Sequence, residues 1–316
     1  MSIRIEYGVP TDRSGINVRF GVAKGFFADE GIDLTVRVVF GGPEIADAYD
    51  SGALKIGELG TPPGITAISR GKRFKIVGSG LARGVSLHFL AQFGLENWSD
   101  LKGRTLGALS IGSCSYWYLR ELLTQHGLDP DKDVVIRGLG PDYPRQLELI
   151  EKGEIAALLT AEPNASLGEA RGIARSWGDV FSLGDVPELQ WVIQVANEAF
   201  LAREPDLVRK ILRITQRSSQ HLLTHRDEWI DFTADIHQVP RDVAASSVIR
   251  ELPFLHFDGQ LDIPGLERAI QLQHQLGAIT TVQPVERYVA PGFDPRFADA
   301  AVRTDKHETA FQPLAL

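Results

Sequence analysis

Hydrophobic and polar residues along the first eighty positions alternate between two patterns. Four short apolar or β-branched runs predict strands: residues 3–8, 34–40, 54–59 and 74–78. Between the first two runs, Val18, Val22 and Phe26 recur at helical spacing, which predicts a helix over residues 17–30 that ends at Gly31. Strands that alternate with helices predict an α/β fold with a mainly parallel sheet.

The middle of the chain repeats the plan of its start. Residues 7–39 and residues 101–139 each run strand, Gly/Ser/Pro-rich turn, helix, glycine, strand. In each unit the turn faces a helix N-terminus, where free backbone N–H groups and the helix dipole favour an anion or a polar ligand. Two such units predict two similar lobes, each directing the start of a helix at a shared cleft.

Three stretches resemble the solute-binding proteins of bacterial ABC importers. They are GFFADEGIDL at 25–34, LKGRTLGA at 101–108 and PDLVRKILR at 205–213. The chain is most similar to the subgroup for sulfonates, nitrate, taurine and thiamine-precursor pyrimidines, which also holds the thiamine-pyrimidine synthases, over about residues 3–295. This resemblance implies a type II periplasmic-binding-protein fold of two α/β lobes with a ligand cleft between them, a small-molecule ligand and an ABC permease as partner.

The resemblance also implies where the chain divides. Two strands cross between the lobes in this fold, and residues 86–92 and 191–196 have the short apolar patterns expected of them. We therefore predict a discontinuous first lobe, residues 1–86 plus 196–316, and a second lobe of residues 87–195. A polar tail from residue 299 is expected to pack on the first lobe as a terminal arm.

Composition excludes several classes of partner and cofactor. The net charge of −8 argues against nucleic acid, because binding to phosphates needs a basic face. No apolar run approaches the length of a membrane span, so no membrane insertion is expected. Cys114 is the sole cysteine and can form no intrachain disulfide. His221 and His225 are four residues apart but lack an acidic partner in a metal-binding pattern, so we expect them to be solvated and expect no metal and no cofactor.

The start of the chain leaves the compartment open. Residues 1–7 enter the first strand at once, without a basic segment, an apolar core or a cleavage site. As written, the chain is expected in the cytoplasm. If a leader was removed or the start misassigned, a periplasmic or cell-surface location fits the resemblance instead.

The predicted ligand site consists of loops that follow the carboxyl ends of strands, where α/β folds place their ligands. The first lobe contributes Thr11, Asp12, Arg13, Gly41, Gly42 and Thr61, and the second contributes Ser110, Ser113, Cys114, Ser115 and Thr160, with Trp191 on the second crossing strand. The alternative for each loop is ordinary turn and helix-capping chemistry, which uses the same residue types.

Charged and aromatic residues extend this prediction. Arg13 is the first candidate to hold an anionic group, with Arg83 and Arg145 as weaker ones, since a guanidinium binds a carboxylate or sulfonate through two hydrogen bonds. The alternative for each arginine is the solvated surface. Four aromatic residues can stack on an aromatic ligand or else belong to the core: Tyr116, Trp117, Tyr143 and Trp191.

Two residues would carry chemistry if the protein is an enzyme. Cys114 is expected at a helix N-terminus, which lowers the pKa of a thiol, and Glu58 at the edge of a sheet can act as a general base. The alternatives are a small thiol that lines a cleft and a salt-bridged structural carboxylate. A related desulfinase branch uses a cysteine in the first strand–helix turn, but residues 8–11 contain none, and the cysteine-rich motif of the yeast-type pyrimidine synthases is also absent.

Together these features predict a solute-binding protein for ABC import. Its ligand would be a small organic molecule, anionic or heteroaromatic, of the sulfonate, nitrate, taurine or pyrimidine type, buried by closure of the lobes. The alternative is a cytoplasmic enzyme on the same scaffold: a decarboxylase, a desulfinase or a related lyase or hydrolase. A ligand sensor that signals to a protein partner is a third possibility.

Overall fold

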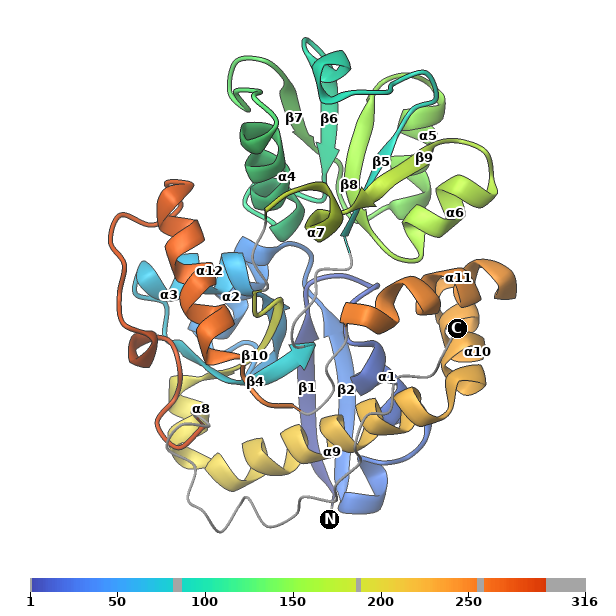
Figure 1. The fold of residues 1–316 in the computed structure, drawn as a ribbon. Helices are drawn as coiled ribbons and strands as arrows, with labels where there is room; N and C mark the ends of the chain where they lie inside the picture. The colour runs from blue at the N-terminus through green and yellow to red at the C-terminus, as the bar shows by residue number, and fades with distance from the viewer. Residues whose placement is uncertain (1, 82–86, 186–188, 255–258, 294–316) are drawn as a thin grey trace.

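Two five-stranded sheets, each covered by helices, make up the protein (Figure 1). A computed structural model describes residues 2–81, 87–185, 189–254 and 259–293. Arg83 and the tail from residue 299 lie outside these residues. The predicted α/β class is confirmed.

The first sheet, sheet A, is built mainly by the first quarter of the chain. Its strands lie in the order β2-β1-β3-β10-β4. Their bounds are β1 Ile3–Val9, β2 Ile32–Val38, β3 Ile56–Gly60, β4 Phe74–Leu81 and β10 Val192–Asn197. β1 pairs in parallel with β2 and β3, whereas β10 runs antiparallel to both β3 and β4.

The second sheet, sheet B, has the same plan. Its strands lie in the order β7-β6-β8-β5-β9. Their bounds are β5 Leu87–Ala91, β6 Thr105–Ala108, β7 Val135–Gly138, β8 Ala157–Ala161 and β9 Arg175–Asp179. The fourth strand in each order, β10 in sheet A and β5 in sheet B, is antiparallel to both of its neighbours. Each is the first strand after the chain crosses from the other sheet. Each sheet is therefore mixed, because the crossing strand arrives from the opposite direction.

The predicted boundary between residues 195 and 196 falls inside β10. All of β10 pairs within sheet A, so residues 192–195 belong with the first half of the structure and not with the second. The hydrophobic run at 191–196 marks this strand correctly, but apolar pattern alone does not say on which side of a crossing the strand pairs. A division before residue 192 fits the sheet pairing better.

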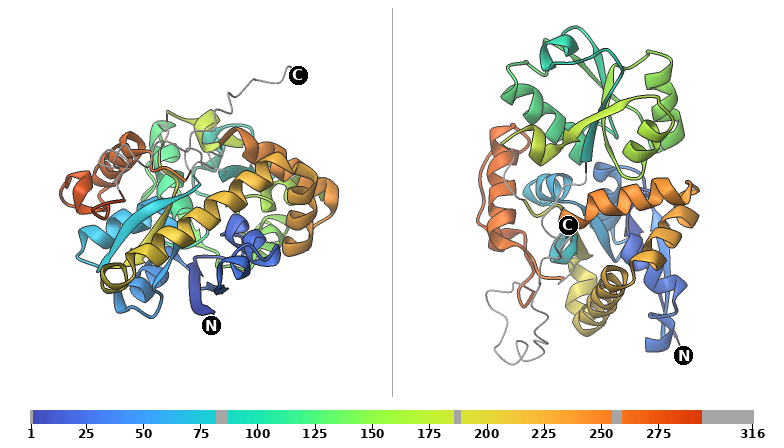
Figure 2. Two further views of the ribbon diagram at one scale, coloured as in Figure 1. Left: turned by 90° about the horizontal axis from the view of Figure 1, so that it is seen from below. Right: turned by 45° about the vertical axis from the view of Figure 1, so that its right-hand side comes forward.

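Helices of sheet A form two groups and an extension. α1 (Ile16–Ala23) packs on the long helix α9 (Pro205–Thr224), which passes in front of β1 and β2 in Figure 1 and is seen along its length from below in Figure 2. The second group contains α2 (Gly42–Ser51), α3 (Thr61–Ser69) and α12 (Ile263–Gln275). The short helix α8 (Glu198–Arg203) leads from β10 into α9, and α10 (Arg226–His237) and α11 (Arg241–Glu251) extend α9 toward sheet B.

Sheet B carries four helices in the described part of the chain. They are α4 (Cys114–Gln125), α5 (Tyr143–Glu151), α6 (Asn164–Ala170) and the single turn α7 (Val180–Leu183). Four short 3-10 turns complete the described elements: η1 Ala28–Glu30, η2 Trp98–Leu101, η3 Leu252–Phe254 and η4 Val285–Arg287. None of the described helices is both long and apolar enough to cross a membrane.

The helix predicted over residues 17–30 is in fact two shorter pieces. α1 ends at Ala23, and Gly25 follows with a φ of +79°, a left-handed conformation that glycine adopts without strain. The turn η1 then covers Ala28–Glu30 and ends at Gly31 with a φ of +75°, as expected for a C-terminal stop. The spacing of apolar residues did not reveal the break, because Phe26 and Phe27, which follow it, also pack against the core.

Candidate functional site

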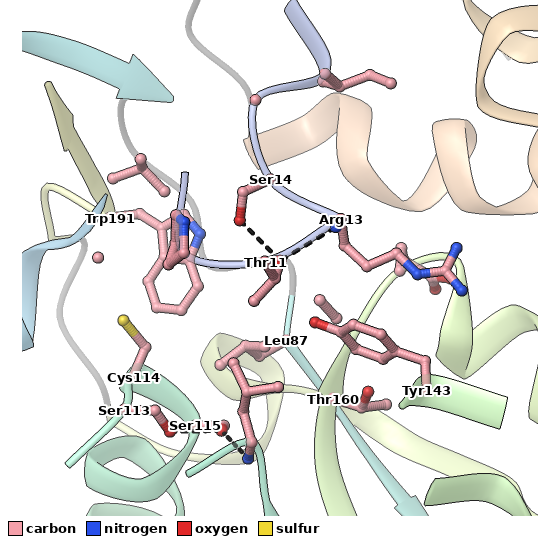
Figure 3. A pocket seen from close by; sticks show the side chains of 18 of the residues that line it. Thr11, Arg13, Ser14, Leu87, Ser113, Cys114, Ser115, Tyr143, Thr160 and Trp191 are labelled. Carbon is pink, nitrogen blue, oxygen red and sulfur yellow. Dashed lines mark hydrogen bonds between the residues drawn. The ribbon is translucent and has the colours of Figure 1, made fainter. Parts of the chain in front are cut away.

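A cavity of about 170 Å³ lies between the ends of the two sheets (Figure 3). From sheet A it is lined by the turn after β1 and by the end of β3. From sheet B it is lined by the start of α4, the end of β8 and the start of α5. The repeated units seen in the sequence therefore meet at one site, because the carboxyl ends of their parallel strands face each other.

Most of the predicted site residues line this cavity. They are Thr11, Arg13, Gly42, Ser113, Cys114, Ser115, Thr160 and Trp191, together with Glu58. Four do not line it: Asp12, Gly41, Thr61 and Ser110.

Local structure explains the residues that do not line the cavity. Asp12 is exposed, and Gly41 directly precedes α2 as its N-cap residue, with a φ of +94°. Thr61 is buried, and both its N–H and its hydroxyl donate to the carbonyl of Trp191 at 2.9 Å. Thr61 therefore fixes the backbone of the residue that carries the indole ring into the site.

In the serine loop before α4, Ser113 and Ser115 use their hydroxyl groups internally, whereas the buried hydroxyl of Ser110 has no partner. Ser113 Oγ donates to the carbonyl of Ser110 at 2.6 Å, so at its 3.1 Å contact with Ser115 Oγ the donor is Ser115. Ser113 Oγ also accepts from the N–H of Tyr116, and Ser115 Oγ accepts from the N–H of Leu109. The hydroxyl protons of Ser113 and Ser115 are therefore both engaged in hydrogen bonds within the loop. What these residues leave for a ligand is mainly the N–H groups of the first turn of α4.

Arg13 is a cation in the cavity wall that has no counter-ion among the described residues. No carboxylate of the described residues lies within ion-pair distance of it. Its guanidinium lies 5.0 Å from the centre of the Tyr143 ring, donates weakly to the carbonyl of His237 at 3.5 Å, and leaves Nε without a partner. Loss of hydration on burial lowers the pKa of Arg13, the direction expected for a half-buried cation without an ion-pair partner.

Glu58 is a buried carboxyl group in the wall of the cavity, with 4% of its surface exposed. Burial raises its pKa from 4.5 to about 7, although Arg19, the Gly15 N–H and the Tyr7 hydroxyl favour the ionised form. The expected alternative, a salt-bridged structural carboxylate, does not fit, because no ion pair to Glu58 occurs among the described residues. At neutral pH the group can therefore give or take a proton.

Cys114 is the first residue of α4, but its thiol is not activated. Burial raises the pKa of Cys114 to about 12, so the expected lowering by the helix N-terminus is wrong. Its Sγ fills the space beside Gly60, at the end of β3, where a β-carbon would lie only 2.0 Å away. The thiol is a packing group between the two halves of the protein.

The other candidates occupy different places. Arg145 forms an exposed ion pair with Glu148 at 3.1 Å, so it lies on the surface. Tyr116 and Trp117 contact each other edge to face outside the cavity, whereas Tyr143 lines it opposite Trp191. Burial raises the pKa of Tyr143 to about 12, which keeps its hydroxyl protonated beside Thr11.

One wall of the cavity has no counterpart in the predicted loops. It consists of side chains from α10 and α11: Thr233, His237, Ser247 and Glu251. A signal for it exists in the sequence of α10, where Thr233 follows the buried Trp229 by four residues and the half-buried His237 follows after four more. A polar residue on a buried stripe indicates a polar partner, but it does not identify which cavity supplies it.

Of the two neighbouring histidines, His221 on α9 is half-buried, and His225 between α9 and α10 is exposed. His221 packs against Phe20 and Phe26 and stacks on His225 at 3.9 Å, so the expectation that both are solvated is wrong for His221. Ligand atoms of His221, His225 and Glu228 all lie within 4.8 Å of one another. The Lys24 ammonium, 2.5 Å from Glu228 Oε2, already neutralises this carboxylate.

A charged contact ties α11 to the sheet B half next to the cavity. Arg250 of α11 pairs with Glu162, which follows β8, at 3.2 Å, and with Glu169 of α6. The Glu162 side chain is fully buried and also lies 3.6 Å from His88 on β5. Burial lowers the pKa of His88, so the imidazole is neutral at pH 7 and Arg250 is the cation that neutralises Glu162.

Known proteins of similar structure share this architecture. The alkanesulfonate-binding protein SsuA from Xanthomonas axonopodis pv. citri, solved with bound MOPS, superposes with a TM-score of 0.76 at 18% identity, over 92% of this chain and 98% of that one. The periplasmic aliphatic sulphonate binding protein SsuA from Escherichia coli gives a TM-score of 0.72 at 17% identity, over 92% of both chains. At this level of identity the likeness shows the periplasmic-binding-protein fold.

Curated relatives at the sequence level are similarly distant. The putative binding protein YtlA of Bacillus subtilis is 24% identical over 230 residues, which cover 68% of this chain and 67% of the relative. The 4-amino-5-hydroxymethyl-2-methylpyrimidine phosphate synthase of Candida albicans is 23% identical over 235 residues, 66% of this chain and 64% of the synthase. The model of the NMT1/THI5-like family matches residues 16–229, and this chain belongs to that family.

Proposed function

We propose that the protein captures a small organic anion between its two halves and presents it to an ABC permease for import. The observation that carries this proposal is Arg13, a half-buried cation in the wall of the cavity with no carboxylate partner among the described residues. Partial burial of a charge without a counter-ion is unfavourable, and an anionic ligand would offset this cost.

The rest of the cavity suits the organic part of such a ligand. The rings of Trp191 and Tyr143 face the space from opposite sides in Figure 3, and Leu87 lies between them. Aromatic and aliphatic walls with a few fixed polar groups are typical of small-molecule sites. The relatives that bind sulfonates support an anionic ligand, and the two halves joined at crossing strands support capture by closure.

A thermal-shift screen tests the proposal. We would measure melting temperatures with sulfonates, sulfinates, aromatic carboxylates, pyrimidines and nitrate, and recover each hit for mass spectrometry. A ligand at about 100 times its Kd adds about 2.7 kcal/mol of stability, which shifts the melting temperature by several degrees. A stabilising anion recovered unchanged supports capture, and a panel without any stabilising anion contradicts it.

Arg13→Gln is the variant that links the screen to the cavity. We expect it to weaken binding of an anionic hit at least tenfold, because the charged donor is lost from a desolvated site. Arg145→Gln is the matched control, since it removes an arginine whose ion pair with Glu148 is exposed. Equal affinities of the Arg13→Gln variant and the wild type in calorimetry would show that the anion binds elsewhere.

An enzyme on the same scaffold is the second candidate, and Glu58 is the observation that favours it. A cavity carboxyl group with a pKa of about 7 is suited to proton transfer. Cys114 gives this candidate no support as a nucleophile, because its thiol stays protonated at neutral pH. Recovery of a chemically altered hit in the same screen, lost with Glu58→Gln, would identify an enzyme.

A further inference from the structure

Two hydroxyl groups in the α10–α11 wall of the cavity have no hydrogen-bond partner in the described structure. Thr233 is 3% exposed and Ser247 is 1% exposed, and neither Thr233 Oγ1 nor Ser247 Oγ makes a hydrogen bond. Helix hydroxyls commonly bond to a carbonyl of the preceding turn, as Thr215 and Ser219 of α9 do here. Burying a hydroxyl without a partner is unfavourable, so each calls for a polar group in the cavity that it lines.

A third unsatisfied donor belongs to the same end of the cavity. Arg13 Nε has no partner, and its guanidinium reaches past Tyr143 toward the carbonyl at the end of α10, away from Trp191 and Cys114 (Figure 3). At the opposite end, the hydroxyl protons of Ser113 and Ser115 are consumed within their loop. Ser110 Oγ also lacks a partner, but Ser110 does not line the cavity. Among the residues that line it, the donors without a partner are therefore those of Arg13, Thr233 and Ser247.

We infer that Thr233, Ser247 and Arg13 form a subsite for the anionic group of the ligand, with the apolar body of the ligand directed toward Trp191. The ligand class is an aliphatic or aromatic sulfonate or carboxylate, whose several acceptor oxygens match three donors. This inference rests on the proposed capture of an organic anion and adds its orientation.

The remaining ionisable groups of the wall are compatible with an anion. Burial lowers the pKa of His237 to about 3, so its imidazole is neutral. The carboxylate of Glu162 is paired with Arg250, and Glu251 already has an interaction partner. The closing of α11 on the sheet B half through Arg250 would hold Ser247 against the bound group.

The test compares an anion with its neutral counterpart. Calorimetry would measure the affinities of 4-toluenesulfonate, hexane-1-sulfonate and 4-methylbenzoate, with 4-toluenesulfonamide as the neutral probe. We expect Thr233→Val and Ser247→Ala each to weaken binding of the anions about tenfold, since each removes a hydrogen bond to a charged group, and to change sulfonamide binding little. Thr233→Ser, which keeps the hydroxyl, should retain the affinity and guards against an effect of altered packing.

The melting temperature of the ligand-free protein provides a second test, because the same substitution that weakens binding should raise it. Thr233→Val removes a buried hydroxyl that has no partner, so the melting temperature of the ligand-free protein should rise by about 2 °C. Thr66→Val is the matched control, because Thr66 Oγ1 of α3 is also buried without a partner but lies outside the cavity. This control should gain ligand-free stability and keep full affinity for the anions.

The outcomes separate the subsite from the proposed function. Anions that bind and are weakened by Arg13→Gln but not by Thr233→Val or Ser247→Ala would overturn the subsite and leave capture standing. If no anion of the panel binds to the wild type, both are overturned. A loss of affinity in the Thr66→Val control would also overturn the subsite, because the effect would then be unspecific.

Discussion

At the scale of the residue, Glu58 couples the cavity to pH. Its pKa is about 7 in the folded protein and about 4.5 when unfolded, so between these values the folded form holds a proton that the unfolded form has released. Stability is therefore greatest below pH 4.5 as far as this group is concerned, and is lost as pH rises to about 7. The difference corresponds to about 3 kcal/mol as an upper bound.

Glu58→Gln should abolish this dependence. An amide is neutral at every pH, so the unfolding free energy of the variant should fall less than that of the wild type between pH 5 and pH 8. Urea unfolding at a series of pH values would measure both curves. Parallel curves would show that Glu58 is ionised throughout and that its burial is compensated by groups such as Arg19.

At the scale of the element, α4 and β3 contact each other where the Cys114 thiol packs against Gly60, which has no side chain. Gly60 has an ordinary extended backbone with a φ of −64°, so glycine is needed there for space and not for conformation. A β-carbon at this position would lie 2.0 Å from Cys114 Sγ. The contact therefore sets how closely the start of α4 approaches the end of β3.

Gly60→Ala should separate these elements and weaken capture. Overpacking of this kind costs about 1–3 kcal/mol, and we expect a comparable loss of ligand affinity or stability. Cys114→Ala alone should be nearly neutral, and the double variant should recover most of the loss, because it removes the clashing sulfur. Calorimetry of the four proteins would measure the coupling, and additive effects would show that the two residues do not meet.

The elements also show which parts of the site could be predicted from the sequence. Strand-end loops around Thr11, Ser113 and Thr160 could be predicted, because every parallel strand presents its carboxyl end at the same edge of the sheet. The hydroxyl geometry of the serine loop could not, since glycine- and serine-rich turns cap helices and bind ligands with the same residues. The wall formed by Thr233 and Ser247 depends on where α10 and α11 pack. The hydrophobic periodicity of a helix predicts which face is buried, but it does not predict which element covers that face.

At the scale of the whole molecule, the ion pairs of Arg250 connect the half that contains sheet A to the half that contains sheet B. Removing it leaves Glu162 buried and unpaired, which is costly. We expect Arg250→Met to populate a more open ligand-free form, seen as a larger radius of gyration in X-ray scattering, and to lower ligand affinity several-fold.

The control for this prediction lies on the same helix. Arg241 of α11 also pairs with two carboxylates, Asp227 and Asp231 of α10, but these lie in the same half and are exposed. Arg241→Met should leave the radius of gyration unchanged. An Arg250→Met variant as compact as wild type would show that packing of α11 on α6, and not the charge, holds the halves together.

The order of strands in sheet A has a consequence for synthesis of the chain. β4 is not hydrogen-bonded to β3, because β10 lies between them and is made more than a hundred residues later. While the ribosome produces the whole of sheet B, the first sheet is left as a three-stranded piece and a separate strand, with open edges facing each other. Such edges are templates for aggregation, so a nascent chain that stalls before residue 192 would need a chaperone more than the finished protein does.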